Sequence, residues 1–451
     1  MSATSPLNCL QSSTSLCAKL PAPLTLIGEI VSVQGSSITA RIPQASVGDL
    51  CYVATRSGQT ITGQIVAFSN ELFSLALFEE PDGIFPGATV RTRGQQLSIP
   101  VGDFLLGRVI TPLGRSLDGE TGGSSQQQRS IWAKPPPASG RPPIESALNT
   151  GVRAIDAFCT LGRGQRMGIF ASAGVGKSTL LAMIARQAAV DVIVVALVGE
   201  RGREVQEFLD DTLGADGLKR SVIVVATSDD SSLLRQTAPY TATTIAEYFR
   251  DQGKDVLLIV DSLTRMARAI RETSIAAGDL PVRHGYTNSV YTQMPKLVER
   301  AGRSTSGSIT ALYTVLTNQE EDIDPLADEV KSLLDGHITL RKEIAELGIL
   351  PAIDITQSIS RLFGRLHQLE YVTSAQAVSR AMSRFLKDRQ ILLLGGAPDA
   401  ELDIILKYQK ELFDVMRQQA NSRISASRAQ DDVVRIAERL VNPASFICEK
   451  K

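Results

Sequence analysis

The chain has 451 residues and carries 47 Lys and Arg against 48 Asp and Glu, so its formal net charge at pH 7 is −1. Apolar residues are 43% and charged residues 21%, the composition of an ordinary globular protein with two or three domains. The neutral balance gives no sign of nucleic-acid binding, and five scattered cysteines without a long apolar run argue against a disulfide framework or a transmembrane helix. We therefore expect a cytoplasmic protein whose membrane association is peripheral, through partners.

The first part of the chain is expected to be a flexible N-terminus over residues 1–22, which are rich in Ser and Thr and lack the features of a signal peptide. Residues 23–95 then alternate short β-type runs with turn residues, a pattern that predicts a small β-barrel. A structural collar is the favoured use of this barrel, ahead of ligand binding. Examples of these runs are Leu26–Val33, Ser37–Ile42, Thr60–Val66 and Leu72–Leu77.

Residues 96–365 are predicted to form an α/β domain. After a Pro-, Gly- and Ser-rich connector, Leu113–Asn149, expected to be extended, apolar strand-like runs alternate with helix-patterned segments. Such alternation is typical of a P-loop core with a parallel sheet. Residues 366–451 show helical periodicity and predict a small helical C-terminal domain. The strand-like runs are Arg166–Phe170, Asp191–Val198, Ser221–Ala226, Val256–Val260 and Ile309–Leu316.

The stretch Ala171-Ser-Ala-Gly-Val-Gly-Lys-Ser178 lies between a strand-like run and a helical run. Backbone N–H groups of a glycine-rich turn and the following helix N-terminus form a cradle for phosphates. Lys177 is expected to contact the β- and γ-phosphates of ATP. The first glycine of the usual pattern is replaced by Ala171, whereas the two glycines nearest the phosphates remain. The predicted nucleotide-binding residues are Ala173, Gly174, Val175, Gly176, Lys177, Ser178 and Thr179.

A second motif, Val256-Leu-Leu-Ile-Val-Asp261, is a buried strand that ends in a carboxylate. At this distance after a P-loop, it predicts that Asp261 and the Ser178 hydroxyl hold Mg²⁺ beside the nucleotide. We expect no metal site other than this one.

A third motif, Gly199-Glu-Arg-Gly-Arg-Glu204, follows another apolar strand. Glu200 is the predicted group that polarises the attacking water. The alternative is that Glu200 only caps a helix or pairs with Arg201. Arg201 and Arg265 are expected to stabilise phosphate charge on the same side of the site.

Arg361 ends the segment Ser358-Ile-Ser-Arg361. Its guanidinium is a candidate arginine finger for the nucleotide of a neighbouring subunit. From residue chemistry alone, a surface ion pair is equally open.

Together with these motifs, further segments occur in an order that resembles the F1/V1-type hexameric ATPases, and most closely the type III secretion ATPases of flagellar export and of virulence injectisomes. The resemblance covers residues 100–370 strongly. The additional segments are Gly151–Asp156, Gly162–Gly168, Asp261–Arg265, Ala327–Val330, Leu334–His337 and Pro351–Asp354.

The resemblance implies a homohexameric ring at the cytoplasmic face of the inner membrane, which hydrolyses ATP to release chaperones from export substrates and to unfold them. The implied partners are a central stalk protein, a stator-type regulator, the export apparatus and effector–chaperone complexes. It also implies that Arg361 acts in trans and that the loop Gly278–Asn288, with Tyr286, faces the central pore and handles substrate. Leu350 stands where many relatives have a tyrosine that stacks on adenine.

Two alternatives to a secretion ATPase share the nucleotide core. One is the catalytic subunit of a rotary F/V-type ATPase, which needs a different partner subunit in its ring. The other is a ring translocase on nucleic acid, against which stand the neutral charge and the absence of an aromatic and basic stacking surface in the barrel segment.

Overall fold

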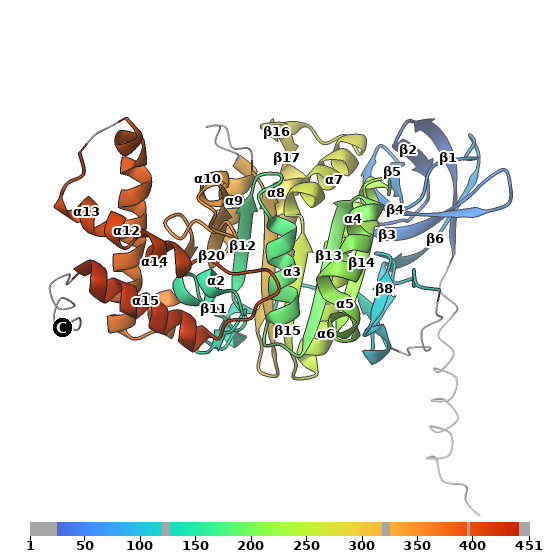
Figure 1. The fold of residues 1–451 in the computed structure, drawn as a ribbon. Helices are drawn as coiled ribbons and strands as arrows, with labels where there is room; N and C mark the ends of the chain where they lie inside the picture. Colours follow the sequence, from blue (N-terminus) through green and yellow to red (C-terminus); the bar gives the residue numbers. More distant parts are fainter. Residues whose placement is uncertain (1–24, 120–126, 318–324, 395–396, 442–451) are drawn as a thin grey trace, which may run out of the picture. The chain divides into compact units, whose positions relative to one another are not determined.

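The computed structural model describes residues 25–119, 127–317, 325–394 and 397–441 (Figure 1). The predicted flexible segment 1–22 lies outside these residues. The chain divides into two compact units with a border between Leu97 and Ser98. The predicted fold class is confirmed, because a closed barrel precedes a parallel-sheet core and a set of C-terminal helices. Among the described residues, no helix combines the length and apolarity that a membrane span requires.

The first unit is a six-stranded antiparallel barrel, closed in the order β1-β2-β5-β4-β3-β6. Its interior is filled by apolar side chains from alternate strand positions, such as Ile30, Val53 and Ile65. Gly28 lies where two strands approach closely, since a Cβ on this residue would be 2.2 Å from the Arg41 carbonyl oxygen. The strands are β1 (Leu26–Gln34), β2 (Ser37–Arg41), β3 (Asp49–Ala54), β4 (Thr60–Ser69), β5 (Leu72–Leu77) and β6 (Thr89–Gln96).

The second unit is built on a sheet in the order β21-β20-β12-β19-β15-β13-β14-β8. All neighbours are parallel except the edge strand β21, and β18 (Gly302–Arg303) adds an antiparallel pair to β19. Every residue of β13 is buried, as the continuous apolar run predicted for a sheet covered on both faces. The strands are β8 (Arg108–Ile110), β12 (Arg166–Ala171), β13 (Val192–Glu200), β14 (Ser221–Thr227), β15 (Asp255–Asp261), β19 (Ser308–Leu316), β20 (Gly336–Leu340) and β21 (Ile359–Ser360).

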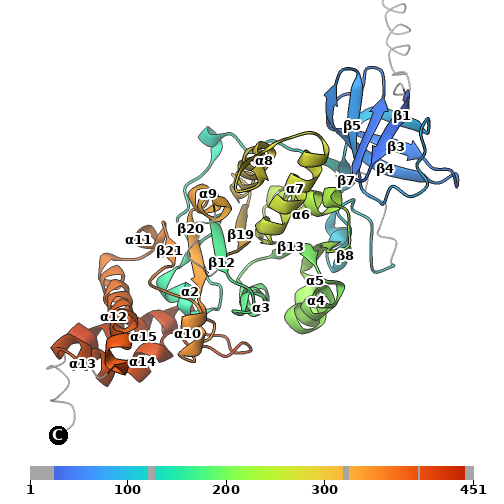
Figure 2. The same ribbon diagram turned by 90° about the horizontal axis from the view of Figure 1, so that it is seen from above.

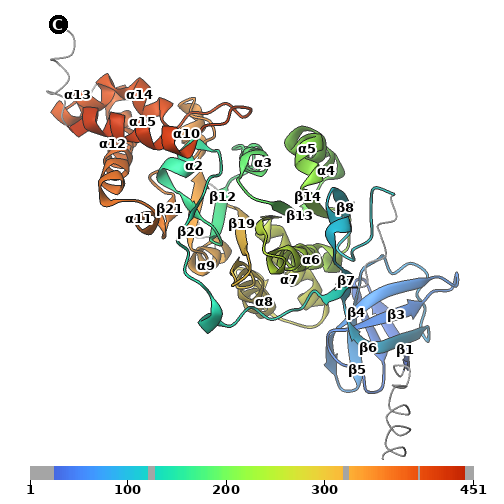
Figure 3. The same cartoon turned by 90° about the horizontal axis from the view of Figure 1, so that it is seen from below.

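Helices cover both faces of this sheet, as the two end-on views show (Figures 2 and 3). One face carries α3 (Lys177–Gln187), α4 (Gly202–Glu207) and α5 (Gly214–Lys219), with η3 (Phe208–Leu213) between the last two. The opposite face carries α6 (Ser232–Asp251), α7 (Leu263–Ala276), α8 (Asn288–Val298) and α9 (Pro325–Leu333).

The remaining elements are short pieces around the sheet and the C-terminal helices. Of these helices, α10 (Lys342–Glu346) lies between β20 and β21. The others follow β21 and are α11 (Phe363–Leu366), α12 (Leu369–Leu393), α13 (Ala400–Lys407), α14 (Gln409–Asp414) and α15 (Ala426–Val441). The short pieces are β7 (Ser98–Pro100), η1 (Asp103–Leu105), β9 (Gln128–Ser130), η2 (Ala138–Gly140), β10 (Ala147–Leu148), α2 (Arg153–Phe158), β11 (Leu161–Gly162), β16 (Pro281–Arg283) and β17 (Tyr286–Thr287).

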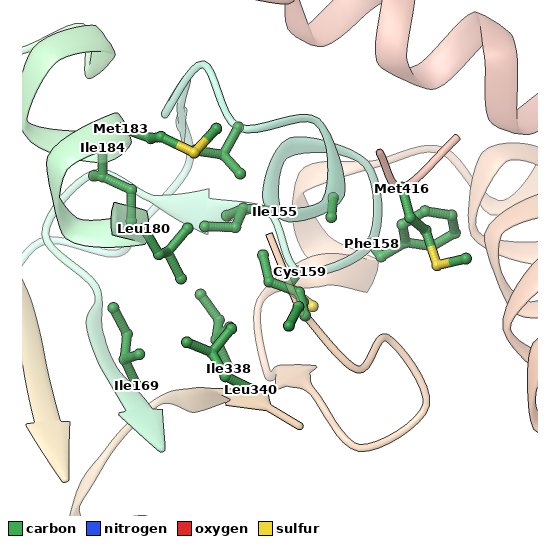
Figure 4. Close-up of a cluster of buried hydrophobic side chains, with 14 of the residues drawn as sticks. Ile155, Phe158, Cys159, Ile169, Leu180, Met183, Ile184, Ile338, Leu340 and Met416 are labelled. Atoms are coloured by element: carbon green, nitrogen blue, oxygen red, sulfur yellow. The ribbon is translucent and has the colours of Figure 1, made fainter. Parts of the chain in front are cut away.

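A continuous apolar core joins the sheet to the C-terminal helices. Figure 4 shows side chains from β12, β20, α2 and α3 packed together, with Met416 against the same cluster. Met416 is 1% exposed and lies between α14 and α15. The C-terminal helices therefore share the core of the nucleotide-binding region.

The structure describes residues 113–119 and 127–149 of the connector, and the second of these parts packs against the core. The Trp132 ring lies 4.6 Å from the Tyr240 ring, centroid to centroid. The Ile131 carbonyl accepts a hydrogen bond from the buried Arg300 guanidinium. The connector is thus held by side chains of α6 and of the residues after α8.

Candidate functional site

The P-loop has the geometry of a phosphate cradle. Strand β12 ends at Ala171 and helix α3 begins at Lys177, so the loop runs directly into a helix N-terminus. Gly174 and Gly176 have φ angles of 80° and 95°, which favour glycine over residues with a Cβ. Most of the loop is exposed, and its backbone N–H groups are accessible to an anion.

Lys177 lies between two carboxylates at the ends of other strands. Its ammonium forms an ion pair with Asp261, the last residue of β15, and lies 3.9 Å from an oxygen of Glu200, the last residue of β13. These strands are parallel to β12, so their carboxyl ends meet at one edge of the sheet, where α/β proteins bind ligands. The structure therefore brings three predicted residues together.

Asp261 is further held by Thr314 of β19, whose hydroxyl donates a 2.7 Å hydrogen bond to the carboxylate. Thr314 is fully buried. Sequence analysis did not single it out, although a threonine inside a mostly apolar strand was a visible signal. Its bond leaves Asp261 oriented toward the P-loop.

Glu200 is a buried carboxylate, 7% exposed. Burial raises its pKa to about 7, and a hydrogen bond with Glu204 and the charge of Asp261 act in the same direction, whereas Arg265 and Lys177 oppose them. The pKa of Glu204 is lowered, chiefly by the same hydrogen bond. The proton is thus held on Glu200 and donated to Glu204, until the pH exceeds about 7.

The two arginines predicted on this side differ. The Arg265 guanidinium is 2.8 Å from Glu200 and also donates to the Gly199 carbonyl, so it lies in the site. Arg201 is exposed and precedes α4 as its N-cap, and its charge lowers the pKa of Glu204.

Arg361 lies at the other end of the strands, away from the P-loop. It follows β21, where Ser360 pairs with Gly336 at the start of β20, and its backbone N–H donates to the Asp335 carbonyl. The end of β20, by contrast, is level with the end of β12. Asp335, which is level with Arg361, lies five residues before Leu340 at the end of β20, so at about 3.3 Å per residue the two ends are roughly 16 Å apart. Arg361 is exposed and does not belong to the phosphate site of its own chain.

A cavity of about 510 Å³ opens beside the P-loop. Its walls come from the P-loop and α3, from the segment before Ala352, and from the segment after α14. Leu350, 56% exposed, lines it at the position where a base-stacking residue was expected. Sequence analysis missed the third wall, which comes from more than sixty residues further along the chain and carries no motif. The lining residues are Val175, Gly176, Thr179, Met183, Gly348, Leu350, Pro351, Ala352, Arg417, Gln418, Gln419 and Ala420.

Comparison with known proteins gives a consistent result. The ATP synthase alpha/beta family, nucleotide-binding domain, matches residues 151–360. The flagellum-specific ATP synthase of Treponema pallidum is 42% identical over 92% of this chain and 93% of its own length. The type 3 secretion system ATPase of Xanthomonas euvesicatoria is 46% identical over 82% of this chain and 84% of its own. The assembled ATPase EscN from the enteropathogenic E. coli type III secretion system has a TM-score of 0.86 at 40% identity, over 91% of this chain and 100% of that one.

The chain belongs to the family of type III secretion and flagellar export ATPases. It is an ATPase of the protein-secreting type, as predicted. Flagellar and secretion relatives match this chain at similar identity.

The family implies a divalent metal with the nucleotide, and the residues present fit Mg²⁺. Asp261 offers a carboxylate and Ser178 an exposed hydroxyl, both hard oxygen donors. Asp261 already faces a cation, the Lys177 ammonium. In the described ranges, no group of three or more His, Cys, Asp or Glu side chains forms a metal site by itself.

The predicted pore loop is an antiparallel hairpin of β16 and β17 that follows α7. Leu280 and Val282 are 79% and 62% exposed, whereas Tyr286 is half-buried. The hairpin thus presents apolar side chains to solvent, a feature typical of a surface that contacts another protein.

Proposed function

We propose that this ATPase hydrolyses MgATP at the P-loop edge of the sheet. The observation that carries the proposal is the meeting of Lys177, Glu200 and Asp261 at the carboxyl ends of parallel strands. Lys177 and the P-loop N–H groups bind the phosphates, and Ser178 and Asp261 hold Mg²⁺. When bound, the metal supplies charge that offsets the developing negative charge on the phosphates.

Glu200 orients the attacking water and accepts its proton at a carboxylate oxygen. Its burial makes it a better base than an exposed glutamate, because its pKa is near neutral. Arg265 holds this carboxylate at 2.8 Å and keeps positive charge next to the phosphate end of the site.

The test is phosphate release by purified chain as a function of protein concentration, with Glu200→Gln as the matched variant. Glutamine keeps the shape and loses the base, so we expect a loss of at least ~100-fold in kcat. Specific activity should rise with protein concentration, because Arg361 reaches a phosphate site only across an interface. Activity that survives the substitution would remove Glu200 from this role.

We further propose that the chain works as a homohexameric ring on secretion substrates, releasing chaperones and unfolding the cargo at the cytoplasmic face of the inner membrane. Support comes from the assembled form of EscN and from its complex with the central stalk EscO. In this ring the hairpin 278–288 faces the pore. Tyr286→Ala should reduce secretion or ATPase activity, and a variant with both intact would contradict the pore-loop role.

A further inference from the structure

The cavity wall formed by residues 417–420 is irregular chain between α14 and α15, and it depends on other segments for its position. Arg417 reaches the turn after α10, donating 2.8 Å and 3.1 Å hydrogen bonds to the carbonyls of Gly348 and Leu347. Arg186 and Gln187, at the far end of α3 from the P-loop, donate to the carbonyls of Ala420 and Ser422. The wall is therefore anchored at its two ends by partly exposed side chains.

Gln418 anchors the middle of the wall and is 7% exposed. Its amide nitrogen donates to the carbonyls of Gly151 at 2.8 Å and Ser422 at 2.7 Å, and its amide oxygen accepts from the Arg153 N–H at 2.6 Å. Its backbone N–H donates to the Leu350 carbonyl at 2.8 Å. One residue thus links two walls of the cavity to the turn that begins α2.

The orientation of the Gln418 amide is fixed by its partners. One neighbour is a donor and two are carbonyl acceptors, so exchanging the amide oxygen and nitrogen would place like groups against each other. Both side-chain N–H groups and the side-chain oxygen form hydrogen bonds, so a glutamate of the same shape cannot keep all of these bonds. A buried amide with this many bonds is costly to disturb, because each lost partner leaves a buried polar group unsatisfied.

The segment that Gln418 contacts, residues 150–153, is itself held by hydrogen bonds and close packing. Asp156 accepts hydrogen bonds from the backbone N–H groups of Thr150 and Gly151 and from the Thr150 hydroxyl, at 2.7–2.9 Å. Gly151 packs on α3, where a Cβ on this residue would lie 2.6 Å from Gln187. Gln418 therefore docks the wall on the core rather than on another loop.

From these contacts we propose that Gln418 is a positioning residue for the base end of the nucleotide. It holds the 417–420 wall against Leu350 at the width that a purine base requires. A firmly held wall then compensates in part for the base stacking that an aromatic ring at position 350 would supply. The inference rests on the proposed binding of ATP at the P-loop. The phosphate end is independent of Gln418, since β13, β15 and the start of α3 hold Lys177, Glu200 and Asp261.

The sharpest test is Gln418→Glu in the full chain. The carboxylate has the same shape but loses both donors and faces two carbonyl oxygens, so KM for ATP should rise about tenfold or more, with kcat within about twofold. Inhibition by inorganic triphosphate, which has no base, should stay within about twofold of wild type. Gln376→Glu is the matched control, because it adds the same charge at an exposed position of α12 that does not line the cavity, and it should change KM little.

Gln418→Met provides a second variant in case the glutamate prevents folding. It keeps the length, removes the side-chain bonds without adding charge, and should raise KM for ATP in the same selective way. An equal weakening of ATP and triphosphate binding, an unchanged KM, or an equal effect of Gln376→Glu would overturn the positioning role. Failure of the wild-type chain to bind ATP would instead overturn the proposed function, and the two failures are therefore distinguishable.

Discussion

At the scale of single residues, the site depends on how burial and neighbouring charge set the protonation of Glu200. The raised pKa follows first from burial and then from the hydrogen bond with Glu204. Ionising both of two carboxyl groups in contact costs free energy because the like charges repel, so one proton is shared between them. Glu204, which the sequence placed only inside a motif, thereby becomes part of the acid–base behaviour of the site.

We predict that kcat/KM for ATP falls on the acid side with an apparent pKa of about 7. The base must be ionised, so activity is present above this pKa and lost as the pH falls through it, about tenfold from pH 8 to pH 6. Glu204→Ala removes a group that raises the pKa of Glu200, and the acid limb should move to lower pH. The pH–rate profile of each variant measures this shift.

Glu207→Ala is the control for that prediction. Glu207 is an exposed acid on the same helix that pairs with Arg203. Its removal changes the charge of α4 equally but should leave the profile in place. An acid limb that does not move in Glu204→Ala would show that the two carboxyl groups do not share a proton.

Residues with a motif were predictable from the sequence, and residues without one were not. Lys177, Asp261 and Glu200 follow apolar strands, and parallel strands place their carboxyl ends together. Gln418 has partners at positions 151, 153, 350 and 422, and nothing in the local sequence indicates such contacts. Arg201 and Arg265 both follow a strand in the sequence and received the same predicted role. Only the geometry of the helix after each strand shows that Arg265 contacts Glu200 whereas Arg201 is exposed.

At the scale of elements, apolar runs predicted the central strands because both faces of the sheet are covered. The sequence analysis did not identify β3, β6 and β20, which mix polar and apolar residues. In addition, β6 pairs with β1 and β20 pairs with β12, strands that are distant in sequence. The connector was predicted to be extended, but its packing on α6 depends on Arg300. This arginine is 1% exposed and far in sequence from the connector.

We predict that Arg300→Met destabilises the protein by about 3–5 kcal/mol. Arg300 donates 2.9 Å and 2.6 Å bonds to the two Glu247 oxygens and also to Thr244. Methionine leaves the buried Glu247 charge unpaired. Denaturant unfolding measures the loss as a lower midpoint.

The double variant Arg300→Met with Glu247→Leu should recover much of that loss, because it removes the unpaired charge together with its partner. Arg203→Met, in an ion pair where the side chains are 88% and 51% exposed, should cost no more than ~0.5 kcal/mol. A double variant no more stable than Arg300→Met would mean that the lost contacts of Arg300 other than Glu247, not the unpaired charge, dominate.

At the scale of the whole molecule, each chain carries the two parts of the proposed active site at opposite ends of its strands. Lys177, Glu200 and Asp261 lie at the carboxyl edge, and Arg361 lies at the opposite edge, about 16 Å away along β20. Head-to-tail contacts between copies bring two different surfaces together and close into a ring. Such a ring would place Arg361 of one chain at the phosphates bound by the next.

This arrangement predicts complementation between two inactive variants. Arg361→Ala should lose about 10³-fold or more in kcat, and Glu200→Gln at least ~100-fold. Mixed before assembly in equal amounts, they should regain activity, because about one interface in four joins an intact phosphate face to an intact Arg361. Mixing Glu200→Gln with Lys177→Ala is the matched control. Both lesions lie on one face, 3.9 Å apart in the native chain, so no interface in that mixture is intact and activity should stay absent. Recovery of ATPase activity in the first mixture alone would place Arg361 in trans. Absence of activity in both mixtures would place the complete site within one chain or assign Arg361 to a surface ion pair.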